Sequence, residues 1–281
     1  MTHLTAYDYF LFKLYGQLLS RGDRSPKVFT VKWGRIVLGL VVAFTAAALG
    51  TDYYARREVP LDMEPLKIDS DVQNLVIIVH GRGDSADDWP RDLKQRFTSL
   101  VMDKRRWQII AYNWHPHSLS SLRAAADGTV IGRQLGKKLA SLDHLTQIHL
   151  IGHSVGSFLI DELCRSYKAH ASNPAHVHMT FLDPFCMQGT IHWKYGMVHF
   201  GEKGDFTEAF INMDDPVPTT NAPLRYAYNY DVTQTAGRES FEGELHWWPV
   251  EYYIGHLDSD HLIGNGLTHA KLRRGKVTPV P

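Results

Sequence analysis

The chain has 281 residues, with 30 basic and 30 acidic side chains and therefore a formal net charge of zero. This balance gives no bulk electrostatic attraction to nucleic acid, and we expect no nucleic-acid partner. The length is enough for one large domain with a buried sheet, and the sequence contains no internal repeat, low-complexity tract or glycine-rich phosphate loop.

An apolar run without charged side chains extends over residues 36–51. Six basic residues precede this run, against two acidic ones, and a basic flank marks the cytoplasmic side of a membrane segment. A helix over this run would cover about 24 Å, somewhat less than a hydrocarbon core of about 30 Å, and the flanking Trp33 and Tyr53 extend the span.

We therefore expect an uncleaved single-pass membrane anchor, with the rest of the chain outside the cytoplasm, which in a bacterium is the periplasm. Two alternatives stay open. Ala46-x-Ala48 resembles a signal cleavage site, which would give a secreted protein, and the run would also suit a buried core helix. The expected regions are a basic, partly amphipathic N-terminus (1–35), the anchor or signal segment (36–51), a linker (52–65), a folded domain (66–270) and a basic tail (271–281).

Beyond residue 66, apolar β-branched runs alternate with helix-like stretches. Such alternation predicts an α/β fold, with a mostly parallel sheet and helices on both faces. The expected strands are 74–79, 107–113, 147–151 and 177–182, and the expected helices are 88–102, 128–142 and 155–168.

The expected strand at 74–79 ends in a loop punctuated by glycines, His80-Gly81-Arg82-Gly83-Asp84. A loop at the carboxyl end of a parallel strand lies at the edge where such sheets build their sites, and a backbone N–H there can stabilise developing negative charge. The backbone N–H of Arg82 is the expected donor.

The most informative stretch is the apolar run that begins at Gln147 and leads into Gly152-His153-Ser154-Val155-Gly156, before a helix-like segment. A serine nucleophile projects from a turn too tight for bulky neighbours, which explains the two glycines. Val155, at the start of the helix, then directs its N–H toward developing negative charge. This setting predicts that Ser154 is a nucleophile and Val155 the second oxyanion donor; the alternative is a structural turn with an idle serine.

A carboxylate ends the next apolar run. Asp183 follows residues 177–182 and therefore lies at the carboxyl edge of a parallel strand, where such sheets build their sites. It is the favoured partner for the catalytic base, although an Asp-Pro pair also commonly ends a strand as a turn. The rival carboxylates are Asp214, Asp215 and Asp231. Asp231 is the most serious of them, because it ends a second strand-like run at 224–230.

The base must follow Asp183 if the order Ser, Asp, His holds. The later histidines are His192, His199, His246, His256, His261 and His269. His246 is favoured because a polar loop precedes it and Pro249 suits the first turn of a following helix. Imidazole takes and returns a proton at neutral pH because its pKa is about 6.5.

The motif at 151–156, with Phe181-Leu182-Asp183-Pro184 downstream, resembles the pancreatic-type lipase family of α/β-hydrolases, which reads Gly-His-Ser-Leu-Gly and then Leu-Asp-Pro. The stretch 214–223 is similar to bacterial lipase-like hydrolases. The resemblance covers roughly residues 72–255 and implies an α/β-hydrolase fold with Asp183 as the acid and His246 as the base. The chain has two cysteines, where secreted animal lipases have many, and we expect it to lack their C-terminal lipid-binding domain.

These residues predict a serine hydrolase that cleaves a lipid-like or small ester through an acyl-enzyme, without metal or cofactor. An amidase, thioesterase or peptidase would use the same triad, because specificity depends on the loops. A catalytically silent, membrane-tethered binding protein is the alternative from another class.

Three smaller expectations concern the surroundings of the site. Residues 184–210, rich in apolar side chains and glycines, are expected to cover the site as an acyl-binding wall or lid; packing into the core is the alternative. Cys164 and Cys186 are expected to be free thiols. His176 and His178, which do not match a recognised zinc spacing, are expected at the surface.

Overall fold

The computed structural model describes residues 26–101, 103–258 and 273–280, with side chains described from residue 33 onward. The chain forms two compact units, residues 1–50 and residues 51–281. The described part of the first unit is helical and belongs to α2 (Pro26–Arg56), whose last residues, from Thr51, belong to the second unit.

Helix α2 contains the one described segment that is long and apolar enough to cross a membrane, Trp33–Arg56, with a mean hydropathy of 1.8. A segment of this kind near an N-terminus fits a membrane anchor and equally a signal sequence. The helix continues beyond the expected end at Thr51. Residues 52–56 are therefore helical and are not part of a linker.

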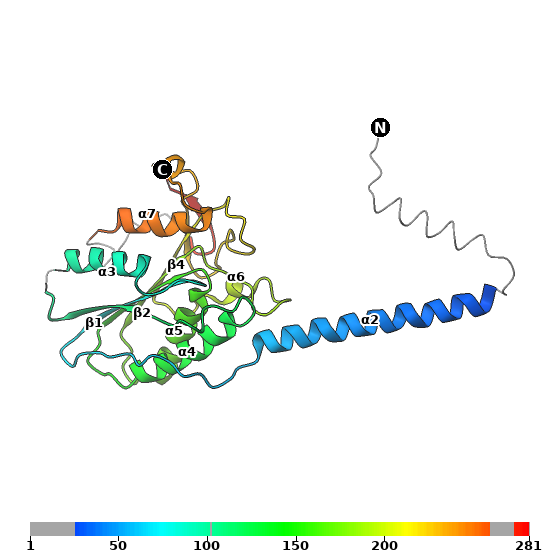
Figure 1. Cartoon of the computed structure of the whole chain (residues 1–281). Coiled ribbons are helices and arrows are strands. Elements are labelled where there is room, and N and C mark those ends of the chain that lie inside the picture. The colour runs from blue at the N-terminus through cyan, green and yellow to red at the C-terminus, as the bar shows by residue number, and fades with distance from the viewer. Residues whose placement is uncertain (1–25, 102, 259–272, 281) are drawn as a thin grey trace. The chain divides into compact units, whose positions relative to one another are not determined.

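The second unit is built around a seven-stranded, entirely parallel sheet in the order β2-β1-β3-β4-β5-β6-β7 (Figure 1). The strands are β1 (Asn74–Val79), β2 (Trp107–Tyr112), β3 (Gln147–His153), β4 (His176–Leu182), β5 (Phe206–Ile211), β6 (Tyr228–Asp231) and β7 (Val277–Pro279). The four expected strands are confirmed to within two residues. The last strand lies inside the expected C-terminal tail and completes the sheet.

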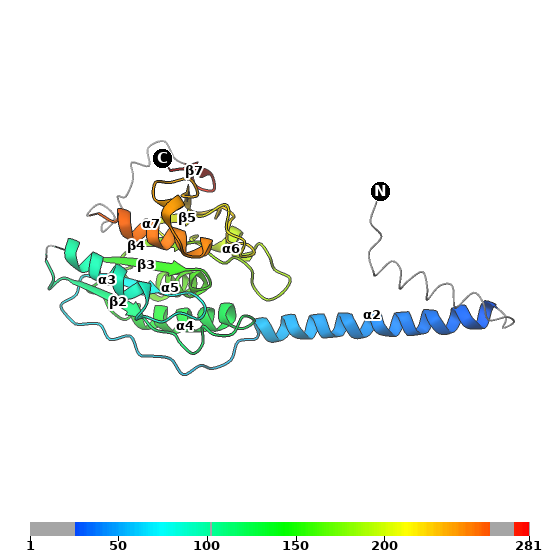
Figure 2. The same cartoon turned by 45° about the horizontal axis from the view of Figure 1, so that its top comes forward.

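Helices cover both faces of this sheet, which confirms the predicted fold class (Figures 1 and 2). One face carries α3 (Trp89–Leu100) and α7 (Trp248–His256), and the other carries α4 (Ala124–Leu139) and α5 (Gly156–His170). A short helix, α6 (Tyr195–His199), and two 3-10 turns, η1 (Arg238–Ser240) and η2 (Leu245–Trp247), lie in the connections.

Strand β1 shows why the sheet needs both helical layers. Its residues alternate between two apolar clusters: Leu75, Ile77 and Val79 face the cluster with α4 and α5, and Val76 and Ile78 face the cluster with α3 and α7. All five side chains are buried. A continuous apolar strand of this kind is stable only in a parallel sheet that is covered on both faces.

Glycines set the close approach of α4 and α5. A Cβ atom on Gly132 would lie 2.2 Å from the backbone oxygen of Leu159, and one on Gly136 would lie 2.5 Å from that of Leu163. The helix backbones therefore meet at positions where no side chain fits. This contact fixes α5, whose first turn follows the candidate nucleophile.

The strand register brings the expected site residues to one edge. Val79 pairs with Gly152, His153 with Leu182, and Leu182 with Phe210. The carboxyl ends of β1, β3, β4 and β5 therefore meet, as is typical of ligand sites in parallel sheets.

Candidate functional site

Ser154 stands at a sharp turn between β3 and α5, with a positive φ of 52°. A non-glycine residue rarely adopts this conformation and does so where the surroundings impose it. Two backbone hydrogen bonds hold the turn: Ser154 N donates to Leu182 O (3.0 Å) and Phe185 N donates to Ser154 O (3.1 Å). The end of β4 therefore fixes the serine.

The flanking glycines have the steric role that the motif predicts. A Cβ atom on Gly156 would lie 2.6 Å from the carbonyl oxygen of His80, and one on Gly152 would lie 3.1 Å from that of Gly156. Helix α5 can therefore begin against the end of β1 only if position 156 is glycine, and a side chain at position 152 would crowd the first turn of the helix.

The loop after β1 lies directly beside the serine. A Cβ atom on Gly81 would lie 3.1 Å from Ser154 Cβ and 2.9 Å from His153 Nδ1. No partner within the described ranges accepts a hydrogen bond from the backbone N–H of Arg82 or of Val155. These are the two amides that were expected to bind the oxyanion, and they remain available for that role.

His246 lies on the turn η2, immediately before α7, which has a proline in its first turn as expected. Its Nδ1 atom faces two carboxylates: Asp215 Oδ2 lies at 2.8 Å and Asp183 Oδ2 at 3.3 Å. Its Nε2 atom is buried and has no hydrogen-bond partner among the described residues. Its ring lies 4.6 Å from the ring of His153, which precedes Ser154. A nitrogen that is buried and unpartnered in this position is suited to act as a base.

Neighbouring polar groups position this histidine and its acids. Asn212, directly after β5, donates through its backbone N to Asp183 Oδ1 (2.8 Å) and through Nδ2 to the carbonyl oxygen of Leu245 (2.8 Å). Thr220 Oγ1 donates to Asp215 Oδ2 (2.5 Å). Asn212 therefore connects the strand end that carries one acid to the turn that carries the base.

His153 fixes the other side of the turn. Its Nε2 lies 3.1 Å from the carbonyl oxygen of His246. Burial lowers the pKa of His153 well below its usual value, and the positive charge of His246 acts in the same direction. The ring is therefore neutral, and its Nε2–H donates to that carbonyl.

The titration of the three central groups is shifted by burial and by one another. Burial raises the pKa of Asp183 to about 7, although its bond to His246 opposes the shift. For Asp215, burial acts in the same direction, but hydrogen bonds from His246 and Thr220 outweigh it and keep the pKa below its usual value. Burial disfavours charge on His246, yet its bonds to Asp183 and Asp215 prevail and raise its pKa to about 9. The pKa of Asp215 is therefore the lower of the two carboxylate pKa values, and both carboxylates favour the protonated form of His246.

The remaining rivals make no contact with His246. Asp231 Oδ1 accepts hydrogen bonds from the backbone N and Oγ1 of Thr233, and the backbone N of Asp214 donates to Asn212 Oδ1. Both residues stabilise turns. His256 is the last residue of α7 and bonds the carbonyl oxygen of Tyr252. His261 and His269 lie outside the described residues.

The segment at 184–210 divides into two parts. Phe200 is buried, and Phe185, Tyr195 and Met197 pack against the core, so this part follows the packing alternative. The side chains of Ile191 and Trp193 are exposed instead. The expected cover is therefore reduced to a short projecting stretch. Cys164 and Cys186 are free and buried, as predicted.

A second polar cluster lies buried within the sheet. His178 Nε2 lies 2.9 Å from Glu208 Oε1, and the rings of His149 and His178 stack with centroids 3.7 Å apart. The expectation that His178 lies at the surface is wrong, because its face of β4 is covered; Phe206 packs against it. The nitrogen lone pairs of two stacked imidazoles lie in nearly parallel planes. They therefore do not point at a common metal ion. We therefore interpret the cluster as a hydrogen-bonded part of the core.

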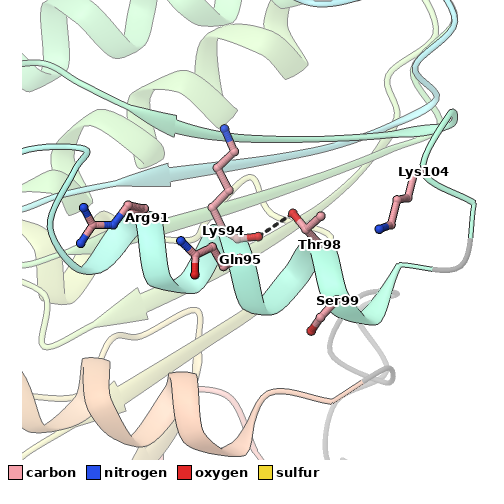
Figure 3. Close-up of a pocket in the computed structure, with 6 residues that line it drawn as sticks. All are labelled: Arg91, Lys94, Gln95, Thr98, Ser99 and Lys104. Atoms are coloured by element: carbon pink, nitrogen blue, oxygen red, sulfur yellow. Dashed lines mark hydrogen bonds between the residues drawn. The ribbon is translucent and has the colours of Figure 1, made fainter.

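An open depression of about 470 Å³ lies on the outer side of α3 (Figure 3). Its lining consists of Arg91, Lys94, Gln95, Thr98, Ser99 and Lys104. The residues of the candidate site are not part of this lining. The depression is distinct from the site around Ser154.

No protein-family model matches the chain, and no curated protein matches it. Among solved structures, the chain is similar to the crystal structure of the lin2722 gene product of Listeria innocua, with 16% sequence identity and a TM-score of 0.44. The match covers 75% of this chain and 99% of that chain. The function is therefore inferred from the residues of the site itself.

Proposed function

We propose that the chain is a membrane-anchored serine hydrolase of the α/β-hydrolase type that cleaves carboxylic esters. One observation carries the proposal. Ser154 stands at a strained strand–turn–helix junction, and the ring of the preceding His153 lies 4.6 Å from that of His246. His246 has a buried Nε2 without a partner among the described residues and two carboxylates at its Nδ1. This combination supports nucleophilic catalysis, which needs a nucleophile on a fixed turn, a base and a group that orients the base.

In the proposed reaction, Ser154 Oγ attacks the ester carbonyl and His246 Nε2 accepts its proton. The carbonyl oxygen becomes an oxyanion, which the backbone N–H groups of Arg82 and Val155 bind. The C–O bond then breaks, and the proton on His246 passes to the leaving alcohol. Water, deprotonated by the same nitrogen, releases the acid from the acyl-enzyme and regenerates the serine.

The two carboxylates stabilise the imidazolium that forms in each step. Asp183 was the acid favoured by the sequence resemblance, and Asp215 was one of its rivals. We propose that both act on the same Nδ1–H, with Asp215 as the closer partner. Because each acid lies within hydrogen-bonding distance of Nδ1, the removal of one acid should lower the activity less than the removal of both.

The substrate that we propose is a lipid-like or small ester. Cleavage of an amide, thioester or peptide bond by the same groups is the alternative within the class. A catalytically silent binding protein is the alternative from another class, and the joint presence of Ser154, His246 and two carboxylates at its Nδ1 favours the hydrolase.

We further propose that α2 is an uncleaved anchor with residues 56–281 outside the cytoplasm, secretion after signal cleavage being the alternative. Washing membranes with alkaline carbonate tests the anchor. The full-length protein should stay in the pellet, and its release would contradict the anchor without affecting the hydrolase proposal.

Activity of the full-length protein in detergent tests the chemistry. The wild type should hydrolyse a short-chain p-nitrophenyl ester, and Ser154→Ala should not. Ser157→Ala is the matched control, because Ser157 is a buried serine in the first turn of the same helix. Equal rates for the wild type and Ser154→Ala would contradict the proposal.

A further inference from the structure

The last turn of α2 is bound firmly to the domain that carries the candidate site. Asp52 is buried, and its Oδ1 accepts hydrogen bonds from the backbone N (2.8 Å) and Oγ1 (3.2 Å) of Thr190. Its Oδ2 pairs with Arg56 at 2.6 Å. A Cβ atom on Gly189 would lie 2.5 Å from Asp52 Oδ1, so the loop at 189–190 fits closely around this carboxylate.

A buried arginine holds the same turn from another side. Arg123 donates to the carbonyl oxygens of Tyr54 and Arg57 and pairs with Asp127 at 2.5 Å. The last carbonyls of a helix have no partner within the helix, and a cation at this end is favourable. Residues 51–57 are therefore part of the domain surface and do not act as a loose tether.

Exposed apolar side chains gather on the segments that hold this turn. In the described part of the second unit, the exposed large hydrophobic residues are Tyr53, Tyr54, Leu119, Leu122, Ile191, Trp193 and Met213. All except Met213 lie in the last turn of α2, in the segment before Arg123 or in the segment after Thr190. Ile191 and Trp193 are 55% and 53% exposed, and it is the gathering of such side chains on neighbouring segments, more than any single one, that marks an interaction surface.

We propose that this surface, made of residues 51–57, 119–123 and 189–193 and here called the collar, lies in the interface of a lipid bilayer. The inference rests on the proposed membrane anchor. If the chain leaves the bilayer at the end of α2, the surface next to that point meets the headgroups. Tyrosine and tryptophan favour this layer because their rings combine apolar area with a polar group.

A short stretch of chain also joins the collar to the candidate site. Ile191 and Trp193 lie on the segment that begins at Asp183, and Phe185 of this segment bonds the backbone of Ser154. A bilayer contact at 189–193 would therefore place membrane lipid next to the chain segment that bounds the nucleophile. The substrate class that fits this arrangement is an ester held in the bilayer.

Spin labelling of the full-length protein in liposomes tests the collar independently of enzyme activity. Nitroxides are attached at Leu122→Cys and Ile191→Cys, with Met213→Cys and Asp92→Cys as exposed controls. Cys164 and Cys186 are buried and do not compete for the label. The ratio of oxygen accessibility to nickel-chelate accessibility should be several-fold higher at positions 122 and 191 than at both controls. Equal nickel accessibility at all four positions would overturn the proposal.

A second measurement separates the collar from the hydrolase proposal. Trp193→Glu and Ile191→Glu should reduce hydrolysis of an ester embedded in vesicles several-fold while leaving hydrolysis of a soluble ester unchanged. If neither ester is hydrolysed by the wild type, the proposed function fails, and the labelling result still decides the collar. A nickel-accessible collar would overturn the inference whatever the rates, and an unchanged rate on vesicles would overturn its claim that the substrate is held in the bilayer.

Discussion

Asp215 Oδ2 lies 2.8 Å from His246 Nδ1, closer than the 3.3 Å that separates the same nitrogen from Asp183 Oδ2. A single imidazole N–H therefore faces two carboxylates. One ends a strand, and the other lies in the loop after the neighbouring strand. Thr220 and Asn212 hold the two acids in place.

This arrangement predicts partial redundancy between the acids. Asp183→Asn and Asp215→Asn should each lower kcat by roughly 10- to 100-fold, the value of one charged hydrogen bond. The double variant should lose on the order of 10⁴, as expected when no carboxylate orients the histidine. Steady-state kinetics of the three variants measure the effect, with Asp231→Asn as an unchanged control. The full loss in Asp183→Asn alone would show that Asp183 is the sole acid.

The pH dependence of the rate follows from the pKa of His246. Burial opposes its charged form, but the two carboxylates outweigh burial and raise its pKa to about 9. Because the base must be unprotonated, kcat/KM should rise through neutral pH and level off only above about pH 9. In Asp215→Asn, one of the raising interactions is lost, and the midpoint should move to lower pH. The rate of the Ser154→Ala variant is subtracted to correct for spontaneous hydrolysis. A wild-type pH–rate profile with its midpoint near the pKa of free histidine would contradict the prediction.

The contact between α4 and α5 gives a prediction about stability. Gly132→Ala would force a methyl group to within 2.2 Å of the backbone of Leu159, so we expect a loss of about 1–3 kcal/mol from overpacking. Gly128→Ala is the matched control, because its Cβ would meet nothing closer than 3.5 Å and alanine favours a helix. Thermal unfolding of both variants measures the difference. Equal melting temperatures of the two variants would contradict the prediction, because they would show that α4 and α5 can move apart with little loss of stability.

Much of the fold could be predicted from local patterns. The strand at 74–79 is apolar from its second residue onward, the expected strand at 147–151 is rich in apolar residues, and the serine turn is marked by Gly152 and Gly156, whose steric role the structure explains. β5 was missed because Glu208 interrupts its apolar pattern. That carboxylate is buried against His178, a contact that only the folded sheet creates.

Without β5, the polar residues that follow it could not be placed. Asn212 is the first residue beyond this strand, and Asp215 lies further along the same loop. Neither position is marked by periodicity, because Asp215 reaches His246, and Asn212 reaches the neighbouring Leu245, through the closure of a loop. Similarly, Asp52 ends the apolar run in the sequence, yet α2 continues because Thr190 and Arg56 satisfy its carboxylate.

Covalent labelling of Ser154 tests the central claim most directly. The full-length protein in detergent is treated with a fluorophosphonate probe, which reacts with serines that an adjacent base activates, and the modified peptide is identified by mass spectrometry. The probe should modify Ser154 in the wild type and in Ser157→Ala and should leave Ser154→Ala unmodified. A folded wild-type protein that takes up no probe, or a Ser154→Ala variant labelled as strongly as the wild type, would contradict the assignment of Ser154 as the nucleophile.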